Sequence, residues 1–445
     1  MADRLSFPRA ELRGRTARGA IVNGFFLGGA EALVLAQGLI VTAILGPRAI
    51  GLYGIVTTTA MTLVALKRVG IDEAFVQQDE AGQEEEFQRA FSVELVVSAA
   101  FSAVIALSAP LVALVYGDER LLALTLAVSY LPLAFALQAP GWIFFRRMEF
   151  MKQRLLQAIV PVVTFVVTVP LAIAGMGVWS LVIGPFVGNV AAVIAAAAVS
   201  PYPLRVKWSR DAARRYLRFS WPIFVAAFAL LVVQQGQILA FDLDSGLAAA
   251  GFITLAFTLT RYADRADQIL TTTIYPAIVA VKDQLGTLRE IYVKSNRVTL
   301  MWALPFGAGF VLFAPDLVNI VLGEEWQPAI VLIQGLAAAT ALQQLGYNWF
   351  SFYRARGESS AQNVESVVLA GTFLAFAIPG LLLWGFEGFV WGRIANVLAV
   401  LVVRRALTRR LLPGVEPFAL LLRGLVPVAL AVAPVVALRL ALWGG

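Results

Sequence analysis

The chain has 445 residues, of which 60% are hydrophobic and 14% are charged, and its mean hydropathy is +0.79. Soluble domains are about half apolar and about a quarter charged, so this composition indicates a multi-pass membrane protein. The sequence has no cysteine and no histidine, which excludes disulfides, thiolate metal sites and histidine acid–base chemistry. We therefore expect neither an enzyme nor a cofactor.

Apolar runs of about 20 residues predict membrane-spanning helices along nearly the whole chain. The basic stretch before the first run has no apolar core, so a cleavable signal peptide is not expected. In chain order, the predicted spans are 19–45, 50–69, 90–116, 121–145, 155–174, 177–199, 220–241, 246–268, 297–322, 327–352, 361–384 and 387–403, with a thirteenth at 424–443.

The basic residues gather in alternate loops between these spans. This bias toward the cytoplasmic side orients multi-pass proteins, and here it places the N-terminus in the cytoplasm. The loop over 71–89 is acidic instead, but acidic residues carry little weight in the rule. Arg404 falls in a cytoplasmic basic loop on this assignment, and Glu94 and Glu365 fall near the cytoplasmic ends of their spans, where they are interpreted as interfacial residues.

Several short phrases recur about 205 residues apart, in the same order. Shared composition of membrane helices is the alternative explanation, but the common order and spacing favour a duplicated unit of six helices. The matched pairs are 51–53 with 250–252, 109–119 (APLVALVYGDE) with 314–325 (APDLVNIVLGEE), and 136–142 (ALQAPGW) with 341–347 (ALQQLGY).

The duplication predicts an all-α membrane protein with two pseudo-symmetric six-helix lobes around a central cavity. The expected divisions are 1–203 for the N-lobe, 204–218 for a basic amphipathic connector, 219–412 for the C-lobe and 413–445 for an extra C-terminal helix. The connector is interpreted as lying on the anionic inner leaflet, and no nucleic-acid partner is expected.

Four motifs resemble the polysaccharide flippases of the Wzx type, which include O-antigen flippases and belong to the polysaccharide transporter family of the MOP superfamily. The motifs are Leu45–Tyr53, Val69–Gln78, Gly175–Val182 and Tyr353–Gly357. The resemblance implies two lobes around a cavity, a location in the bacterial inner membrane, and export of undecaprenyl-pyrophosphate-linked oligosaccharide by alternating access.

The resemblance also implies the partners: a lipid-linked oligosaccharide, membrane lipids, and a polysaccharide polymerase with other assembly proteins. The sequence does not define a coupling ion, H⁺ or Na⁺. A cation-coupled small-molecule or drug antiporter of the MATE type, in the same superfamily, is the alternative function. A membrane polymerase or ligase is a weaker alternative, because the chain lacks a large loop between its predicted spans.

Pyrophosphate and sugar crossing a membrane need cations and hydrogen bonds, so charged residues within spans are the candidate site. In the eighth span, Arg261, Asp264, Arg265 and Gln268 fall at i, i+3, i+4 and i+7 on one helical face. They begin about 22 Å from the outer end at about 1.5 Å per residue. The alternative is an interfacial turn whose charges pair locally.

Four further residues complete the candidate set. Glu31 lies mid-span in the first predicted helix, as a cavity-lining carboxylate or a buried, protonated one. Arg68 stands at a depth comparable to that of Arg261, where a role in anchoring the span is equally open. Arg393, two turns into the twelfth span, is expected to meet another helix or a ligand. Gln235 lines the sugar path or bonds between helices.

Overall fold

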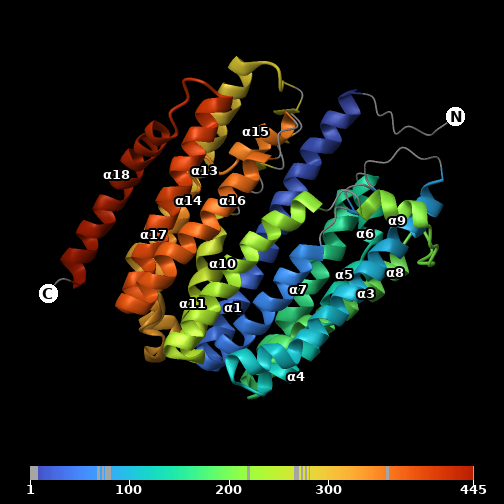
Figure 1. Cartoon of the computed structure of the whole chain (residues 1–445), viewed down its shortest axis with the longest axis horizontal. Coiled ribbons are helices and arrows are strands. Elements are labelled where there is room, and N and C mark those ends of the chain that lie inside the picture. The colour runs from blue at the N-terminus through green and yellow to red at the C-terminus, as the bar shows by residue number, and fades with distance from the viewer. Residues whose placement is uncertain are drawn as a thin grey trace. The chain divides into compact units, whose positions relative to one another are not determined.

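The backbone contacts divide the chain into two compact units, residues 1–227 and 228–445. Every regular element among the described residues is helical (Figure 1). The computed structural model describes residues 9–67, 71–72, 75, 82–147, 149–217, 221–264, 270–271, 274–275, 278–279, 281–356 and 360–443.

The first unit is built from long helices joined by short turns. Its closest packing is between α7 and α8, where Gly184 and Gly188 face Thr168 and Thr164 at distances that leave no room for a side chain. Its elements are α1 (Arg9–Lys67), α3 (Gln83–Tyr116), α4 (Arg120–Val128), α5 (Leu131–Leu137), α6 (Pro140–Arg146), α7 (Phe150–Ile173), η1 (Gly177–Trp179), α8 (Ser180–Val199) and α9 (Arg210–Leu217).

The second unit repeats this organisation and adds one helix. The helix α10 (Trp221–Ser245) leads into it from the first unit. The remaining elements are α11 (Leu247–Thr260), η2 (Arg261–Asp264), α13 (Leu285–Asp316), η3 (Leu317–Leu322), η4 (Glu324–Trp326), α14 (Ala329–Gln343), α15 (Trp349–Ala355), α16 (Ser360–Thr372), η5 (Phe373–Ala377), α17 (Ile378–Leu411) and α18 (Pro417–Trp443).

The duplication inferred from the sequence is visible in where the helices break. The helix α1 leaves helical geometry at Gly46, with φ 73° and ψ 171°, between the first two predicted spans. Gly246, 200 residues later, separates α10 from α11 with nearly the same angles, φ 78° and ψ −175°. A positive φ of this kind favours glycine because it has no Cβ, and Pro47 then starts the next helical segment with its fixed φ.

Later breaks follow the same order in the two units. The turns after α3 and η3 contain Gly117 and Gly323, both with positive φ. The repeated ALQ phrase breaks a helix in each unit, at Gln138–Ala139 between α5 and α6 and at 344–348 between α14 and α15. The backbone thus confirms that the recurring phrases mark equivalent points of a repeated chain path.

Eight helical segments within the described residues are long and apolar enough to cross a membrane. Two of them, Gly28–Lys67 and Asn363–Leu411, each cover most of two predicted spans, because the break inside each does not end the hydrogen-bonded helix. The tenth predicted span is shorter than expected: α14 stops at Gln343 and the chain turns before α15.

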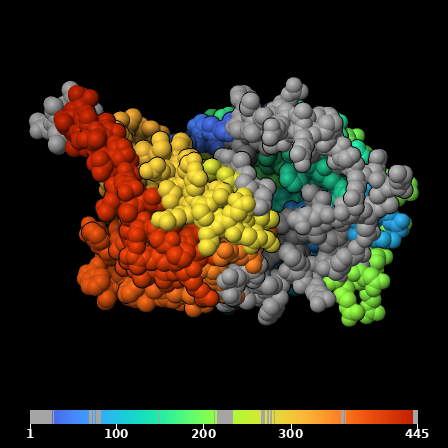
Figure 2. Space-filling view, turned by 90° about the horizontal axis from the view of Figure 1, so that it is seen from above, coloured from blue at the N-terminus to red at the C-terminus, as the bar shows by residue number. Residues whose placement is uncertain are grey.

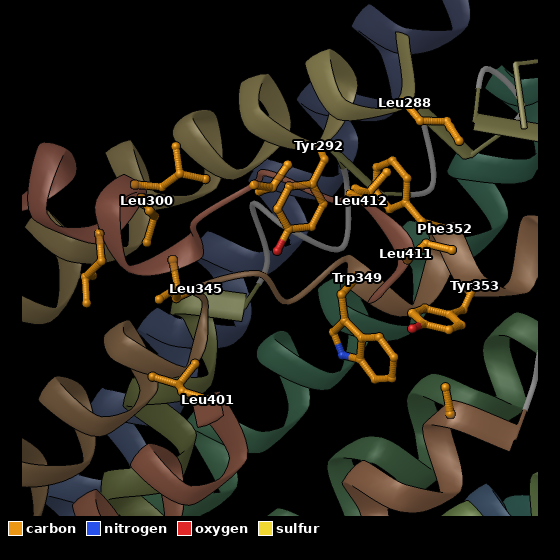
Figure 3. Close-up of a cluster of buried hydrophobic side chains, with 14 of the residues drawn as sticks. Leu288, Tyr292, Leu300, Leu345, Trp349, Phe352, Tyr353, Leu401, Leu411 and Leu412 are labelled. Atoms are coloured by element: carbon orange, nitrogen blue, oxygen red, sulfur yellow. The ribbon is translucent and has the colours of Figure 1, made fainter. Parts of the chain in front are cut away.

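Both units have buried apolar clusters near their polar residues. In the second unit, Tyr292 of α13 packs edge-on against Phe352 of α15, with ring centroids 5.4 Å apart (Figure 3). In the first unit, Phe87 of α3 packs against Tyr202, just before the connector, with ring centroids 5.9 Å apart. The salt bridge between Lys207 and Glu85, 2.9 Å, holds the connector at the same place.

The C-terminal helix α18 packs along α13 and is otherwise exposed (Figure 2, red against yellow). Near its end, Arg439 pairs with Asp316 at 2.7 Å and lies over the Phe313 ring. At its start, Glu416 accepts hydrogen bonds from Arg405 and Arg409 of α17. The extra helix expected over 413–445 is therefore present and is fixed by charge at both ends.

Candidate functional site

The predicted charged face of the eighth span begins with a tight turn. The helix α11 ends at Thr260, and the chain tightens into the 3₁₀ turn η2 over Arg261–Asp264. Tyr262 and Ala263 of this turn are buried, and the indole N–H of Trp302 donates to the Tyr262 carbonyl at 3.4 Å. The burial of Tyr262 and Ala263 and the hydrogen bond from Trp302 therefore hold the backbone of the turn in place.

Asp264 is hydrogen-bonded to the turn that follows α14, where the tenth predicted span breaks. The Gln344 amide N–H donates a hydrogen bond to Asp264 Oδ1. Gln344 is fully buried and follows α14 directly, in the second copy of the repeated ALQ phrase. The duplicated motif thus supports the turn that carries the charged residues.

Arg261 is exposed, in contrast to its neighbours on the turn. Its guanidinium carbon lies 5.7 Å from the centroid of the Tyr262 ring. Among the described residues it forms no salt bridge. An arginine has five N–H donors and suits phosphate oxygens, so Arg261 offers a cation that can bind an anionic group.

Arg404 of α17 shows the opposite arrangement. Its Nη2 and Nε donate to the two carboxylate oxygens of Glu365, at 2.8 and 3.2 Å. Its Nη1 donates to the carbonyls of Gln343 at 2.5 Å and Leu345 at 3.0 Å. Only 3% of Arg404 is exposed. Protein groups therefore take up most of its donors, and Arg404 holds α14, α16 and α17 together.

A polar cavity of about 240 Å³ lies beside Arg404 within the second unit. Asn348, which lines this cavity, accepts a hydrogen bond from Asn296 at 3.1 Å and donates one to Ser295 at 2.7 Å. The cavity has room for a few water molecules or hydroxyl groups. It is lined by Thr271, Tyr347, Asn348, Trp349, Phe350, Ser351, Glu365, Ser366, Leu369 and Arg404.

The first unit has its own buried ion pair. Lys67 Nζ lies 2.6 Å from Glu94 Oε1 and 2.7 Å from Ser98 Oγ, and a longer contact of 3.5 Å reaches the Pro132 carbonyl. Lys67 is 4% exposed and Glu94 is 9% exposed. Three acceptors match the three N–H donors of the ammonium group, so this cation is also neutralised within the protein.

The other predicted site residues occupy varied places. Glu31 is half-buried in α1 of the first unit, and Gln235 is half-buried in α10 of the second. Arg393 is buried in α17, where it donates to Asn396 at 2.5 Å and lies over the Phe373 ring. Arg68, Arg265 and Gln268 lie outside the described residues. Of the predicted site residues, Asp264 is hydrogen-bonded to Gln344, and Arg393 is hydrogen-bonded to Asn396.

The sequence patterns predicted neither Gln344 as the partner of Asp264 nor Arg404 as the partner of Glu365. The interpretation of Arg404 as a loop residue was wrong, since it is buried and paired with Glu365. The sequence did contain a signal for this ion pair. Glu365 lies just inside the start of one predicted span, and Arg404 lies at the end of the next predicted span. Because antiparallel neighbours meet at the same depth, these opposite charges could have been paired. The same rule finds Lys67 with Glu94.

The arrangement of helices and buried charges defines a multi-pass membrane protein with the fold of the MOP transporters. An inward-facing multidrug resistance MATE family transporter of the MOP superfamily matches with a TM-score of 0.73 at 17% identity, over 88% of this chain and 98% of that one. The lipid II flippase MurJ, in an inward closed conformation, matches with a TM-score of 0.70 at 10% identity, over 92% of each chain.

Sequence comparison then gives the family. The polysaccharide biosynthesis protein family matches residues 40–331, and the chain belongs to that family. It is also 24% identical, over 374 residues, to the succinoglycan biosynthesis transport protein ExoT of Rhizobium meliloti (strain 1021), covering 81% of this chain and 74% of that protein. The resemblance to polysaccharide flippases is thereby confirmed, and the chain is a membrane transporter of this class.

Proposed function

We propose that the protein moves a polyprenyl-pyrophosphate-linked oligosaccharide from the cytoplasmic to the periplasmic leaflet of the bacterial inner membrane. The family membership supports a polysaccharide precursor as cargo. The relative from Rhizobium meliloti is named as a succinoglycan biosynthesis transport protein, which agrees with a saccharide cargo. The N-terminus faces the cytoplasm in this proposal, as the distribution of basic loops predicts.

The observation that carries the proposal is the difference between Arg261 and the two buried cations. Lys67 and Arg404 are neutralised by Glu94 and Glu365, so they are poor candidates for binding phosphate. Arg261 is exposed, without a salt bridge among the described residues, and is held on a turn anchored by buried side chains. An exposed guanidinium that forms no salt bridge among the described residues matches the charge of a pyrophosphate headgroup.

The fold likeness alone does not choose between cargoes, because a drug transporter and a lipid II flippase both share it. The family match favours the saccharide precursor over a small cationic drug. A positively charged contact residue such as Arg261 points the same way, since it repels a cation and attracts a phosphate. Within the proposal, Arg265 and Arg68 add to this cationic set, and Glu31 and Gln235 contact the saccharide.

A deletion strain tests the proposed cargo. Loss of the gene should abolish surface polysaccharide and cause its lipid-linked precursor to accumulate, with the saccharide still accessible from the cytoplasmic side. Plasmid-borne wild-type protein should restore both. A deletion strain that keeps normal surface polysaccharide but becomes sensitive to cationic drugs would favour the antiporter instead.

A further inference from the structure

A groove of about 480 Å³ opens along the first half of α17 and the segment before it, and its lining includes no residue of the turn that carries Arg261. This volume lies within the range of about 300–1,000 Å³ that is typical of small-molecule sites. The groove is lined by Phe376, Gly380, Trp384, Glu387, Gly388, Trp391, Gly392 and Ala395.

The floor of the groove is backbone. A Cβ placed on Gly380 would lie 2.2 Å from the Gly388 carbonyl oxygen, and one placed on Gly388 would lie 2.1 Å from the Gly380 carbonyl oxygen. A Cβ on Gly392 would lie 2.4 Å from the carbonyl oxygen of Phe376. The two helical stretches therefore touch backbone to backbone, which leaves an open trough between the side chains that flank it.

Two tryptophans and one carboxylate stand around this trough. Trp384 is 72% exposed and Trp391 is 70% exposed, although both are large apolar side chains. Glu387 and Trp391 are four residues apart and share one face of α17. Glu387 is exposed, and in the part of the chain that the structure describes it has no hydrogen bond or salt bridge.

The equivalent corner in the first unit lacks this set of groups. Gly385 (φ 64°) turns the chain in the second unit, and Gly175 (φ 82°) turns it in the first. Ala174 stands before Gly175 where Trp384 stands before Gly385, and the short turn from Gly175 to Trp179 contains no acidic residue. The corner itself therefore requires the glycine but neither Trp384 nor Glu387.

We propose that this groove is a saccharide-binding site, with hexopyranose rings stacked on Trp384 and Trp391 and hydroxyl groups donating to Glu387. The apolar C–H face of a pyranose complements an indole face, and the charged acceptor strengthens the hydroxyl hydrogen bond. A simple ammonium ion would also suit a carboxylate beside an aromatic ring, but it would fill only a small part of a 480 Å³ groove.

The site extends the proposed function and depends on the topology assigned there. The groove lies where the predicted spans 361–384 and 387–403 meet, which is the periplasmic side when the N-terminus is cytoplasmic. A saccharide site at this place would hold the sugar after its headgroup leaves the cytoplasmic leaflet, separately from the phosphate contact at Arg261.

Saturation-transfer NMR on the purified full-length protein in detergent tests the site, with cellobiose, lactose and gentiobiose as probes. Pyranose ring protons of at least one disaccharide should receive saturation from the protein. Trp384→Ala and Trp391→Ala should each weaken binding about fivefold, and Glu387→Gln should weaken it about tenfold. Trp384→Phe keeps an aromatic ring and should retain most of the binding, which separates a lost contact from a misfolded variant.

Two controls isolate the groove. Trp179→Ala removes the tryptophan of the equivalent corner and should leave disaccharide binding unchanged. Arg261→Gln should also leave it unchanged, so a failure of the groove is distinguishable from a failure of the phosphate contact. The proposal is overturned if none of the three disaccharides binds, if binding survives in the Trp384→Ala/Trp391→Ala protein, or if tetramethylammonium binds at Glu387 in preference to all three sugars.

Discussion

Arg404 and Glu365 form a bidentate ion pair in the interior of the second unit, with N–O distances of 2.8 and 3.2 Å. The same guanidinium donates to the carbonyls of Gln343 and Leu345, where α14 ends. The Arg404 side chain thus connects α17 to α16 and to the turn that follows α14. That break also provides Gln344, which supports the turn that carries Arg261.

Removing one member of this pair should destabilise the protein strongly. Glu365→Gln leaves the Arg404 charge buried without its counter-ion, and such changes cost about 3–5 kcal/mol. Thermal unfolding in detergent should show a clear fall in Tm. Replacing both residues, as Glu365→Leu with Arg404→Met, removes the uncompensated charge and should recover part of the loss. A Glu365→Gln protein with unchanged Tm would show that the pair does not support the fold.

The effect of burial can be measured by comparing two ion pairs of almost equal length. Lys67 and Glu94 are 2.6 Å apart and buried, whereas Lys294 and Glu290 are 2.5 Å apart and mostly exposed. A double-mutant cycle with Lys67→Met and Glu94→Gln should give a coupling energy above about 1.5 kcal/mol, clearly larger than the coupling energy of the exposed pair, which water and salt screen. Equal coupling energies in the two cycles would contradict this.

The turn after α3 should respond to acid. The Arg120 side chain donates hydrogen bonds to Asp118 and holds the pKa of that carboxyl below its usual range. A lowered pKa means that the stabilisation is fully present above the unfolded-state pKa, near 3.8, and is lost as the pH falls through the folded-state value. The Tm difference between wild type and Asp118→Asn should be small and constant from about pH 5 to 8, and it should vanish in stronger acid.

Gln344 should affect transport more than stability. Gln344→Met keeps the volume of the side chain but removes the hydrogen bond to Asp264, which helps to hold η2. A displaced Arg261 should lower the transport rate about tenfold, since small misplacements of binding groups are costly. The matched control is Gln343→Met, one residue earlier, because the Gln343 side chain has no such bond among the described residues. Equal losses in both variants would contradict the positioning role.

The sequence was sufficient to predict the helical class and the positions of several helix breaks. Glycine and proline produced a clear signal at Gly46, whereas the predicted spans 121–145 and 327–352 ran through the breaks at 138–139 and 344–348, and the recurring ALQ phrase showed only that these two places are equivalent. These features are local, because each depends on the backbone preferences of a few adjacent residues.

The charged contacts could be predicted only in part. Helical periodicity placed Arg261 and Asp264 on one face, but it could not show that the helix tightens into a 3₁₀ turn or that Gln344 binds Asp264. Those facts depend on packing between segments about 80 residues apart. Positive-inside counting likewise treated Arg404 as a surface residue, because it considers the sign of a charge and ignores its neighbours on other helices.

In the proposed function, Arg261 binds the phosphate of a lipid-linked saccharide during its transfer between leaflets. Purified protein in liposomes, supplied with polyprenyl-pyrophosphate-linked oligosaccharide, allows the transfer to be measured by the accessibility of the sugar to an external glycosidase. Wild type should transfer the lipid, Arg261→Gln should lower the rate at least about tenfold, Arg261→Lys should retain part of it, and Arg297→Gln, an exposed arginine of α13, should match wild type. Normal transfer by Arg261→Gln would contradict the account.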